Sequence, residues 1–79
     1  MNREALARKL RVLRAERRMS LRDVEKLTGV NKLTISLAER GVRRPYDTTL
    51  AKLAAGYGVP VEELFEVEGS AGKAPAPAA

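Results

Sequence analysis

The sequence predicts an all-α domain of five short helices, and three observations lead to this prediction. Apolar residues recur at helical spacing, first at Leu6, Leu10 and Leu13. Residues that cap helix N-termini precede the apolar segments, and glycines follow several of them. No segment alternates apolar and polar residues as a half-buried strand would. We therefore expect a compact helical fold without a sheet.

The first helix is predicted over residues 2–17, where Leu6, Leu10 and Leu13 form one narrow apolar stripe. Basic side chains occupy much of the remaining helix surface. A basic amphipathic helix can lie on an anionic membrane, but this stripe lacks Trp and Phe, and further helical signals follow at once. A helix that faces a protein core is the better interpretation.

The second helix begins after Ser20 and lasts about two turns. The Ser20 hydroxyl can accept hydrogen bonds from backbone N–H groups, and Asp23 follows in the first turn, as in a capping box. We expect Val24 and Leu27 to be its apolar contacts. Gly29 ends the helix, because glycine adopts the left-handed backbone conformation without strain.

The third helix lies between Asn31, a good N-cap residue, and Gly41, which stops it. Apolar residues occupy two opposite sides of this helix, namely Ile35 with Ala38 and Leu33 with Leu37. A domain this small has one core, so only one of these sides can pack inside. The other side is left to contact something else.

Two more helices complete the predicted domain. Asp47 or Thr48 can cap the fourth helix, and Pro60 suits the first turn of a short fifth helix. The apolar residues of these helices are Leu50, Leu53, Ala54 and Tyr57, followed by Val61, Leu64 and Phe65.

The 79-residue chain has the length of one small domain, which we assign to residues 1–68. Residues 69–79 contain only Gly, Ser, Ala, Pro and one Lys. They have nothing to bury, and we predict a flexible tail or linker there. No apolar run approaches the roughly 20 residues of a membrane span, and the N-terminus lacks the apolar stretch of a signal peptide. We therefore expect a cytoplasmic protein that is not bound to a membrane.

Charge is divided unevenly along the chain. Residues 1–44 hold 13 basic and 5 acidic side chains, a net charge of +8, whereas residues 45–79 hold 2 basic and 5 acidic side chains, a net charge of −3. The first half is a candidate for binding a polyanion. The alternative is an ordinary solvated surface that keeps the protein soluble.

The composition argues against catalytic and metal-binding classes. The chain has no His and no Cys, so the common zinc ligand sets and the Ser-His and Cys-His nucleophile pairs cannot be built. Glu62 and Glu63 are adjacent, and neighbouring residues on a helix do not face each other. No glycine-rich phosphate loop precedes a Lys and a Ser or Thr. We expect no enzyme activity, no metal and no cofactor.

The segments "TGVNKLTIS", "ERG", "TLAKLA" and "GVPVEELF" resemble the Cro/CI-type helix-turn-helix family, also called the xenobiotic-response-element family. The resemblance covers residues 4–66. It implies a compact five-helix, lambda-repressor-like domain whose second helix lies across the DNA backbone and whose third helix enters the major groove. It also implies a nucleoid-associated transcriptional regulator of repressor type. The expected partner is double-stranded DNA, bound by a homodimer at a palindromic site.

The resemblance also implies roles for individual residues. Ile35 and Ala38 would pack into the core, and Arg14 would form an ion pair with Glu39 between the first helix and the end of the third. The expected base contacts are Lys32, Leu33, Ser36 and Leu37. The expected phosphate contacts are Arg22, Asn31, Thr34, Arg40, Arg43 and Arg44. Backbone N–H groups at the starts of the second and third helices would add donors for phosphates.

Several positions depart from the family pattern. Glu25 stands where a small residue usually packs between the second and third helices, so its carboxylate needs a partner, for which Lys32 is a candidate. Ala38 replaces a larger aliphatic residue. Tyr46 and Asp47 replace the usual Ser and apolar residue at the start of the fourth helix, which can shift that boundary by one residue.

A protein-interaction module is the main alternative to a DNA-binding protein. Leu33 and Leu37 would form an apolar strip on an otherwise polar surface, and such strips often mark protein interfaces. An antitoxin, or a regulator controlled by a bound protein partner, would fit this reading.

Overall fold

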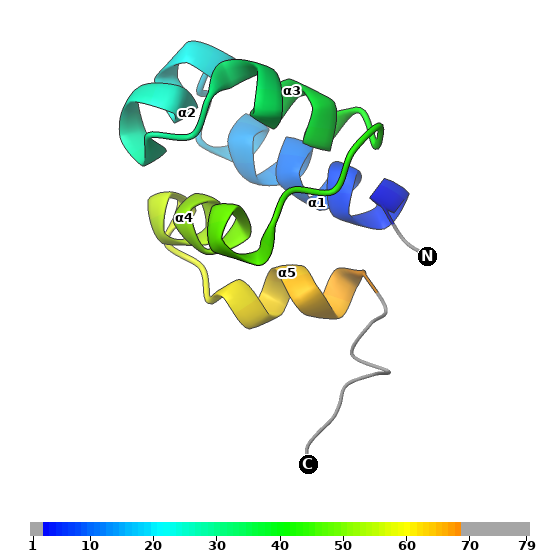
Figure 1. Cartoon of the computed structure of the whole chain (residues 1–79). Coiled ribbons are helices and arrows are strands. Elements are labelled where there is room, and N and C mark those ends of the chain that lie inside the picture. The colour runs from blue at the N-terminus through cyan, green and yellow to red at the C-terminus, as the bar shows by residue number, and fades with distance from the viewer. Residues whose placement is uncertain (1–2, 69–79) are drawn as a thin grey trace.

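The structure, a computed structural model, describes residues 3–68, and these form five α-helices (Figure 1). The helices are α1 (Arg3–Glu16), α2 (Leu21–Thr28), α3 (Lys32–Glu39), α4 (Asp47–Tyr57) and α5 (Val61–Val67). No strand occurs within residues 3–68, and the predicted all-α, five-helix fold is confirmed. The predicted tail at 69–79, and with it the domain limit at 68, lies outside the described residues.

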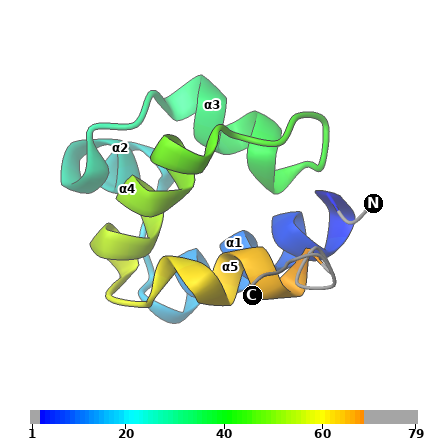
Figure 2. The ribbon, with the colours of Figure 1, turned by 60° about the horizontal axis from the view of Figure 1, so that its bottom comes forward.

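The helices pack in a fixed set of pairs. α1 lies against α3 and α5, α2 lies against α3 and α4, and α4 lies against α5. As a result α3 and α5 occupy opposite sides of the molecule, as two views of the ribbon show (Figures 1 and 2). The side of the molecule that carries α3 is therefore far from the acidic α5.

The core lies between the helices and consists of the residues that helical spacing selected. Leu6, Leu10 and Leu13 of α1 are buried, as is Ile35 of α3. Burial of side chains of this size stabilises the fold by about 1.5–3 kcal/mol each. The other fully buried large residues are Val24, Leu50, Leu53 and Leu64.

The start of α2 has the predicted capping box. The Asp23 N–H donates to the Ser20 hydroxyl at 3.0 Å, and the Ser20 N–H donates to the Asp23 carboxylate at 2.9 Å. The backbone hydrogen bond from Ser20 lowers the pKa of Asp23. Gly29 follows the helix with a φ of 78°, the left-handed conformation that the sequence required there.

Two local predictions are wrong. Leu27 is not a core contact, because 53% of its surface is exposed. α2 turns Val24 toward the core instead and leaves Leu27 at the edge, beside Gly56 of α4. Neither Asp47 nor Thr48 caps α4, because Tyr46 holds the N-cap position without a side-chain hydrogen bond. Pro45, which is buried, disfavours a helical backbone at Arg44, so α4 begins after the proline.

Candidate nucleic-acid interface

α3 buries one of its two apolar sides and exposes part of the other. Ile35 and Ala38 face the core and are 1% and 2% exposed. On the opposite side Leu33 is 62% exposed, whereas Leu37 is half-buried. Of the other predicted base contacts, Lys32 is exposed and Ser36 is half-buried. The outer side of α3 thus presents one apolar and one cationic side chain in its first turn.

Two side chains occupy the N-terminus of α3. The Asn31 amide oxygen accepts the Leu33 N–H at 2.8 Å, and a Glu25 carboxylate oxygen accepts the Lys32 N–H at 3.1 Å. Lys32 is therefore the partner of Glu25, as predicted, but it binds the carboxylate through its backbone N–H and not through its ammonium group. These N–H groups, like those capped at the start of α2, are already satisfied. The expectation that they bind phosphate needs correction.

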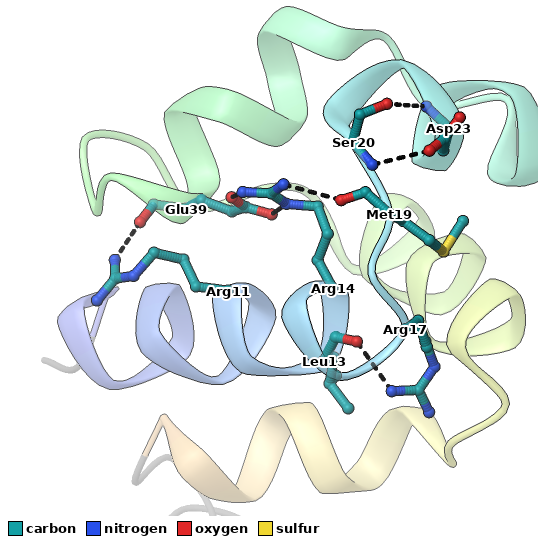
Figure 3. A network of polar contacts seen from close by, with 8 residues as sticks. All are labelled: Arg11, Leu13, Arg14, Arg17, Met19, Ser20, Asp23 and Glu39. Atoms are coloured by element: carbon teal, nitrogen blue, oxygen red, sulfur yellow. Dashed lines mark hydrogen bonds and ion pairs between the residues drawn. The ribbon is translucent and has the colours of Figure 1, made fainter.

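The C-terminal end of α3 is fastened to α1 by an arginine fork (Figure 3). Arg14 Nε and Nη2 donate to the two carboxylate oxygens of Glu39, each at 2.8 Å, and Nη1 donates to the Met19 carbonyl at 3.0 Å. Glu39 is 4% exposed, and its hydrogen bonds raise the pKa of Arg14. The fork joins α1, α3 and the turn that leads into α2.

Two further arginines of α1 hold backbone carbonyls at the same end of α3. Arg11 donates to the Glu39 carbonyl, and Arg3 donates to the Val42 carbonyl at 3.1 Å. A carboxylate at the start of a helix and guanidinium groups at its end are the charges that the helix dipole favours. The outer side of α3 is thus presented at a fixed angle by contacts at both of its ends.

The predicted phosphate contacts differ in whether their side chains are available to bind DNA. Arg22, Arg40 and Arg43 are exposed, and their side chains make no hydrogen bond or ion pair with other residues of the described part. Arg44, by contrast, donates to both carboxylate oxygens of Glu68, with Nη2 to Oε1 at 3.0 Å, and lies 2.8 Å from an Asp47 oxygen. These hydrogen bonds raise its pKa, and its donors are largely taken.

A pocket lies beside α3, at the start of α4. It is lined by Thr34, Arg43, Arg44, Pro45, Tyr46 and Thr49. The pocket brings together three of the predicted phosphate contacts, two of them cationic. Tyr46 lies at its edge and is 79% exposed. Sequence reasoning gave Tyr46 no role, although its departure from the family pattern marked the position.

Several basic residues that contribute to the net positive charge of the first half make contacts within the fold instead of forming a free basic surface. Arg17 donates from Nε and Nη2 to the Tyr57 carbonyl at 3.1 and 2.6 Å, and its guanidinium lies 5.4 Å from the centre of the Tyr57 ring. Lys9 pairs with Glu63 at 2.6 Å. No sequence pattern predicts these contacts, because most of the acceptors are backbone carbonyls, which every residue has.

Neither a membrane span nor a metal centre is formed by residues 3–68. None of the five helices has the length and apolar character needed to cross a bilayer. Within the same residues no three or more acidic side chains gather as metal ligands would.

Comparisons with known proteins agree with this geometry. The chain is 40% identical over 60 residues to a protein of Mycobacterium bovis named as an HTH-type transcriptional regulator, with 76% of this chain and 23% of that protein covered. It is 43% identical over 56 residues to the cryptic phage CTXphi transcriptional repressor RstR of Vibrio cholerae, covering 71% of this chain and 50% of the repressor.

A third relative is the HTH-type transcriptional regulator DdrOP3 of Deinococcus deserti, which is 38% identical over 61 residues, with 77% of this chain and 47% of the relative covered. The chain thus spans between about a quarter and a half of these relatives. No solved structure gave a significant match. A model of the helix-turn-helix domain matches residues 5–66, and the chain belongs to that family.

Proposed function

We propose that this protein binds double-stranded DNA in a sequence-specific manner and acts as a transcriptional regulator of repressor type. The observation that carries the proposal is the outer side of α3. It exposes Lys32 and Leu33, and the unpaired cations Arg22, Arg40 and Arg43 are predicted to flank it. An exposed helix with cations beside it fits the major groove, whose walls are phosphate.

In this proposal the side chains of α3 read bases. Lys32 can donate to the acceptors on a guanine edge, and Leu33 and Leu37 can lie against the methyl group of thymine. Ser36 can contact either kind of base. The free cations Arg22, Arg40 and Arg43, together with Asn31 and Thr34, would position the protein on phosphates. Arg44 would have to share its donors with Glu68 and Asp47, so we assign it a smaller part.

Repression would follow from occupancy alone, with no catalytic step. A protein that covers a promoter excludes other proteins from it. We also propose a homodimer on a palindromic site in the cytoplasm, with half-sites one helical turn, or roughly 34–36 Å, apart. The relatives named as transcriptional regulators and as a repressor support the assignment as a regulator of repressor type.

Selection of bound sequences from a random duplex pool tests the proposal. We expect one motif to be enriched, with two inverted half-sites if the protein acts as a dimer. The same selection with Lys32→Ala should lose its preference at a guanine position and keep the rest of the motif. If no sequence is enriched above the input pool, the protein does not read DNA sequence.

Binding of a protein partner is the second candidate. The exposed fractions of Leu33, Val42 and Tyr46 are 62%, 55% and 79%, and exposed apolar side chains can mark an interface. A module that binds only protein should bind random duplex weakly and without a steep dependence on salt. The duplex titration at several salt concentrations therefore separates the two candidates.

A further inference from the structure

We infer that Glu25 is a positioning residue for DNA recognition, which sets both the placement of the α3 N-terminus and its selectivity for one sequence. This inference rests on the proposed function. Glu25 lies in α2, and its hydrogen bond to the Lys32 N–H reaches across the turn between the two helices. Lys32 and Leu33, the exposed side chains of the first turn of α3, directly follow the N-cap residue Asn31 that this bond helps to hold.

The hydrogen bond fixes the first turn of α3. Asn31 satisfies only the Leu33 N–H, and the Lys32 N–H depends on the carboxylate from the neighbouring helix. Without that acceptor, the first turn of α3 could tilt or fray, because its remaining cap is local to the same segment. Base contacts lose strength quickly when the contacting groups are misplaced, so the placement of this turn affects specific binding more than general attraction.

The charge of Glu25 has a separate effect on binding. A carboxylate beside the start of α3 occupies the place where a helix N-terminus would otherwise attract a phosphate. It also repels the DNA backbone whatever its sequence. The charge of Glu25 should therefore weaken binding to all duplexes, while its hydrogen bond strengthens the distinction between them. Specificity is a ratio of affinities, and a repulsion that acts equally on every duplex leaves this ratio unchanged, so the selectivity comes from the hydrogen bond to the Lys32 N–H.

Three variants separate the two properties of the Glu25 side chain, namely the length that lets it accept the Lys32 N–H and its negative charge. Glu25→Gln keeps an oxygen that can accept the Lys32 N–H and removes the charge. Glu25→Asp keeps the charge and shortens the side chain by one methylene, so the oxygen no longer reaches. Glu25→Ala removes both. Glu62→Gln is the matched control, because it removes one negative charge from an exposed position of α5, on the side of the molecule opposite α3.

The measurements are affinities for the selected site and for random duplex, at several salt concentrations. Glu25→Gln should tighten binding to both duplexes and keep their ratio. Glu25→Asp should keep the random-duplex affinity and reduce the ratio by about tenfold, the scale of one hydrogen bond to a charged group. Glu25→Ala should tighten random binding and reduce the ratio. The control Glu62→Gln should change neither quantity as strongly as Glu25→Gln does.

A ratio that stays constant in Glu25→Asp and Glu25→Ala would overturn the inference, as would an equal loss of both affinities, which indicates a purely structural role. Hydrogen exchange of the Lys32 amide gives a readout that does not involve DNA. We expect exchange about tenfold faster in Glu25→Ala and nearly unchanged in Glu25→Gln. Unchanged exchange in Glu25→Ala would overturn the inference even if the wild type selects one sequence. A wild type without sequence preference would instead overturn the proposed function.

Discussion

At the scale of single residues, Leu33 gives the sharpest test of base reading. It is 62% exposed, so Leu33→Ala should leave the free energy of unfolding almost unchanged. Truncation of the half-buried Leu37 would disturb packing as well. We expect Leu33→Ala to weaken binding to the selected site by about 1–3 kcal/mol, the usual scale of one lost base discrimination. Binding to random duplex should change little.

The thymine methyl group is the contact that this prediction assumes. Replacing thymine by uracil at one position of the selected site removes only that methyl group. Wild-type protein should lose affinity at the contacted position, and Leu33→Ala should lose less. If no uracil substitution affects the wild type, the leucines do not read DNA, and a protein partner explains their exposure better.

Tyr57 gives a prediction that does not depend on DNA. Its hydroxyl is buried and has no hydrogen-bond partner within residues 3–68. Burial, which is the largest cause, and the nearby Glu39 carboxylate raise the pKa of Tyr57 from 10.0 to about 12. The unfolded chain therefore loses this proton first as the pH rises. The contribution of Tyr57 to the free energy of unfolding is constant below pH 10 and falls as the pH rises toward about 12.

Tyr57→Phe should remove that alkaline loss. At neutral pH it should also raise the free energy of unfolding by about 1 kcal/mol, because an unsatisfied buried donor is replaced by hydrogen. Urea unfolding of both proteins at pH 7 and pH 11 measures the two effects. Parallel losses in the two proteins between these pH values would show that other groups cause the alkaline instability.

At residue level, helical spacing and the need for a single core predicted that only one apolar side of α3 is buried, and the resemblance to the family selected Ile35 and Ala38, which are buried, over Leu33, which is exposed. The same reasoning could not find the contacts of Arg3 and Arg11. Their acceptors are backbone carbonyls 39 and 28 residues away, and every residue carries a carbonyl. Such contacts follow only from the packed arrangement of the helices.

At the scale of helices, the Arg14–Glu39 fork should be a main fastening of α3 to α1. Glu39→Gln keeps the shape of the side chain but leaves the Arg14 charge without its partner. We expect the free energy of unfolding to fall by about 3 kcal/mol, as when one member of a buried ion pair is removed. A double-mutant cycle with Arg14→Gln isolates the pair. A coupling near zero would mean that the two charges act as independent surface groups.

The contact between α2 and α4 depends on the absence of a side chain at Gly56. A Cβ atom there would lie 2.4 Å from Thr28 Cγ2. Thr28 cannot turn away cheaply, because its hydroxyl donates to the Val24 carbonyl and accepts the Val30 N–H. Gly56→Ala should therefore destabilise the fold by about 1–3 kcal/mol, although alanine is the better helix former by about 1 kcal/mol.

Thr28→Ser supplies the control for this prediction, because it deletes the obstructing methyl group and keeps the hydroxyl. In the Thr28→Ser background, Gly56→Ala should cost less than in the wild type, as thermal unfolding of the four proteins would show. Equal costs in both backgrounds would mean that the helices do not approach as closely as the structure shows.

The helices could be predicted where their ends are marked by local chemistry. The Ser20 side chain accepts the Asp23 N–H at the start of α2, and the Asn31 side chain accepts the Leu33 N–H at the start of α3. Caps of this kind can be predicted from the sequence, because both partners lie in the same short segment. The start of α4 was missed because Tyr46 caps it without a side-chain hydrogen bond. Leu27 was misplaced because α2 has only 8 residues, and in so short a helix spacing alone does not decide which apolar residue lies at the edge of the core.

At the scale of the whole molecule, the charge count overstates the surface available to DNA. Residues 1–44 carry a net charge of +8, but Arg3, Arg11 and Arg17 hold backbone carbonyls. The acidic α5 lies on the side of the molecule away from α3 (Figure 2). The proposed footprint thus consists of four cations per chain, which are Arg22, Lys32, Arg40 and Arg43.

The dependence of duplex affinity on salt tests the central claim most directly. The whole chain is titrated onto its selected duplex at several salt concentrations, and the logarithm of the affinity is plotted against the logarithm of the salt concentration. Arg22, Arg40 and Arg43 on phosphates give a slope of about −3 for one chain and about −5 for two, because each neutralised phosphate contributes roughly −0.9. A slope in this range agrees with a basic face that binds DNA around α3. A flat response would contradict it.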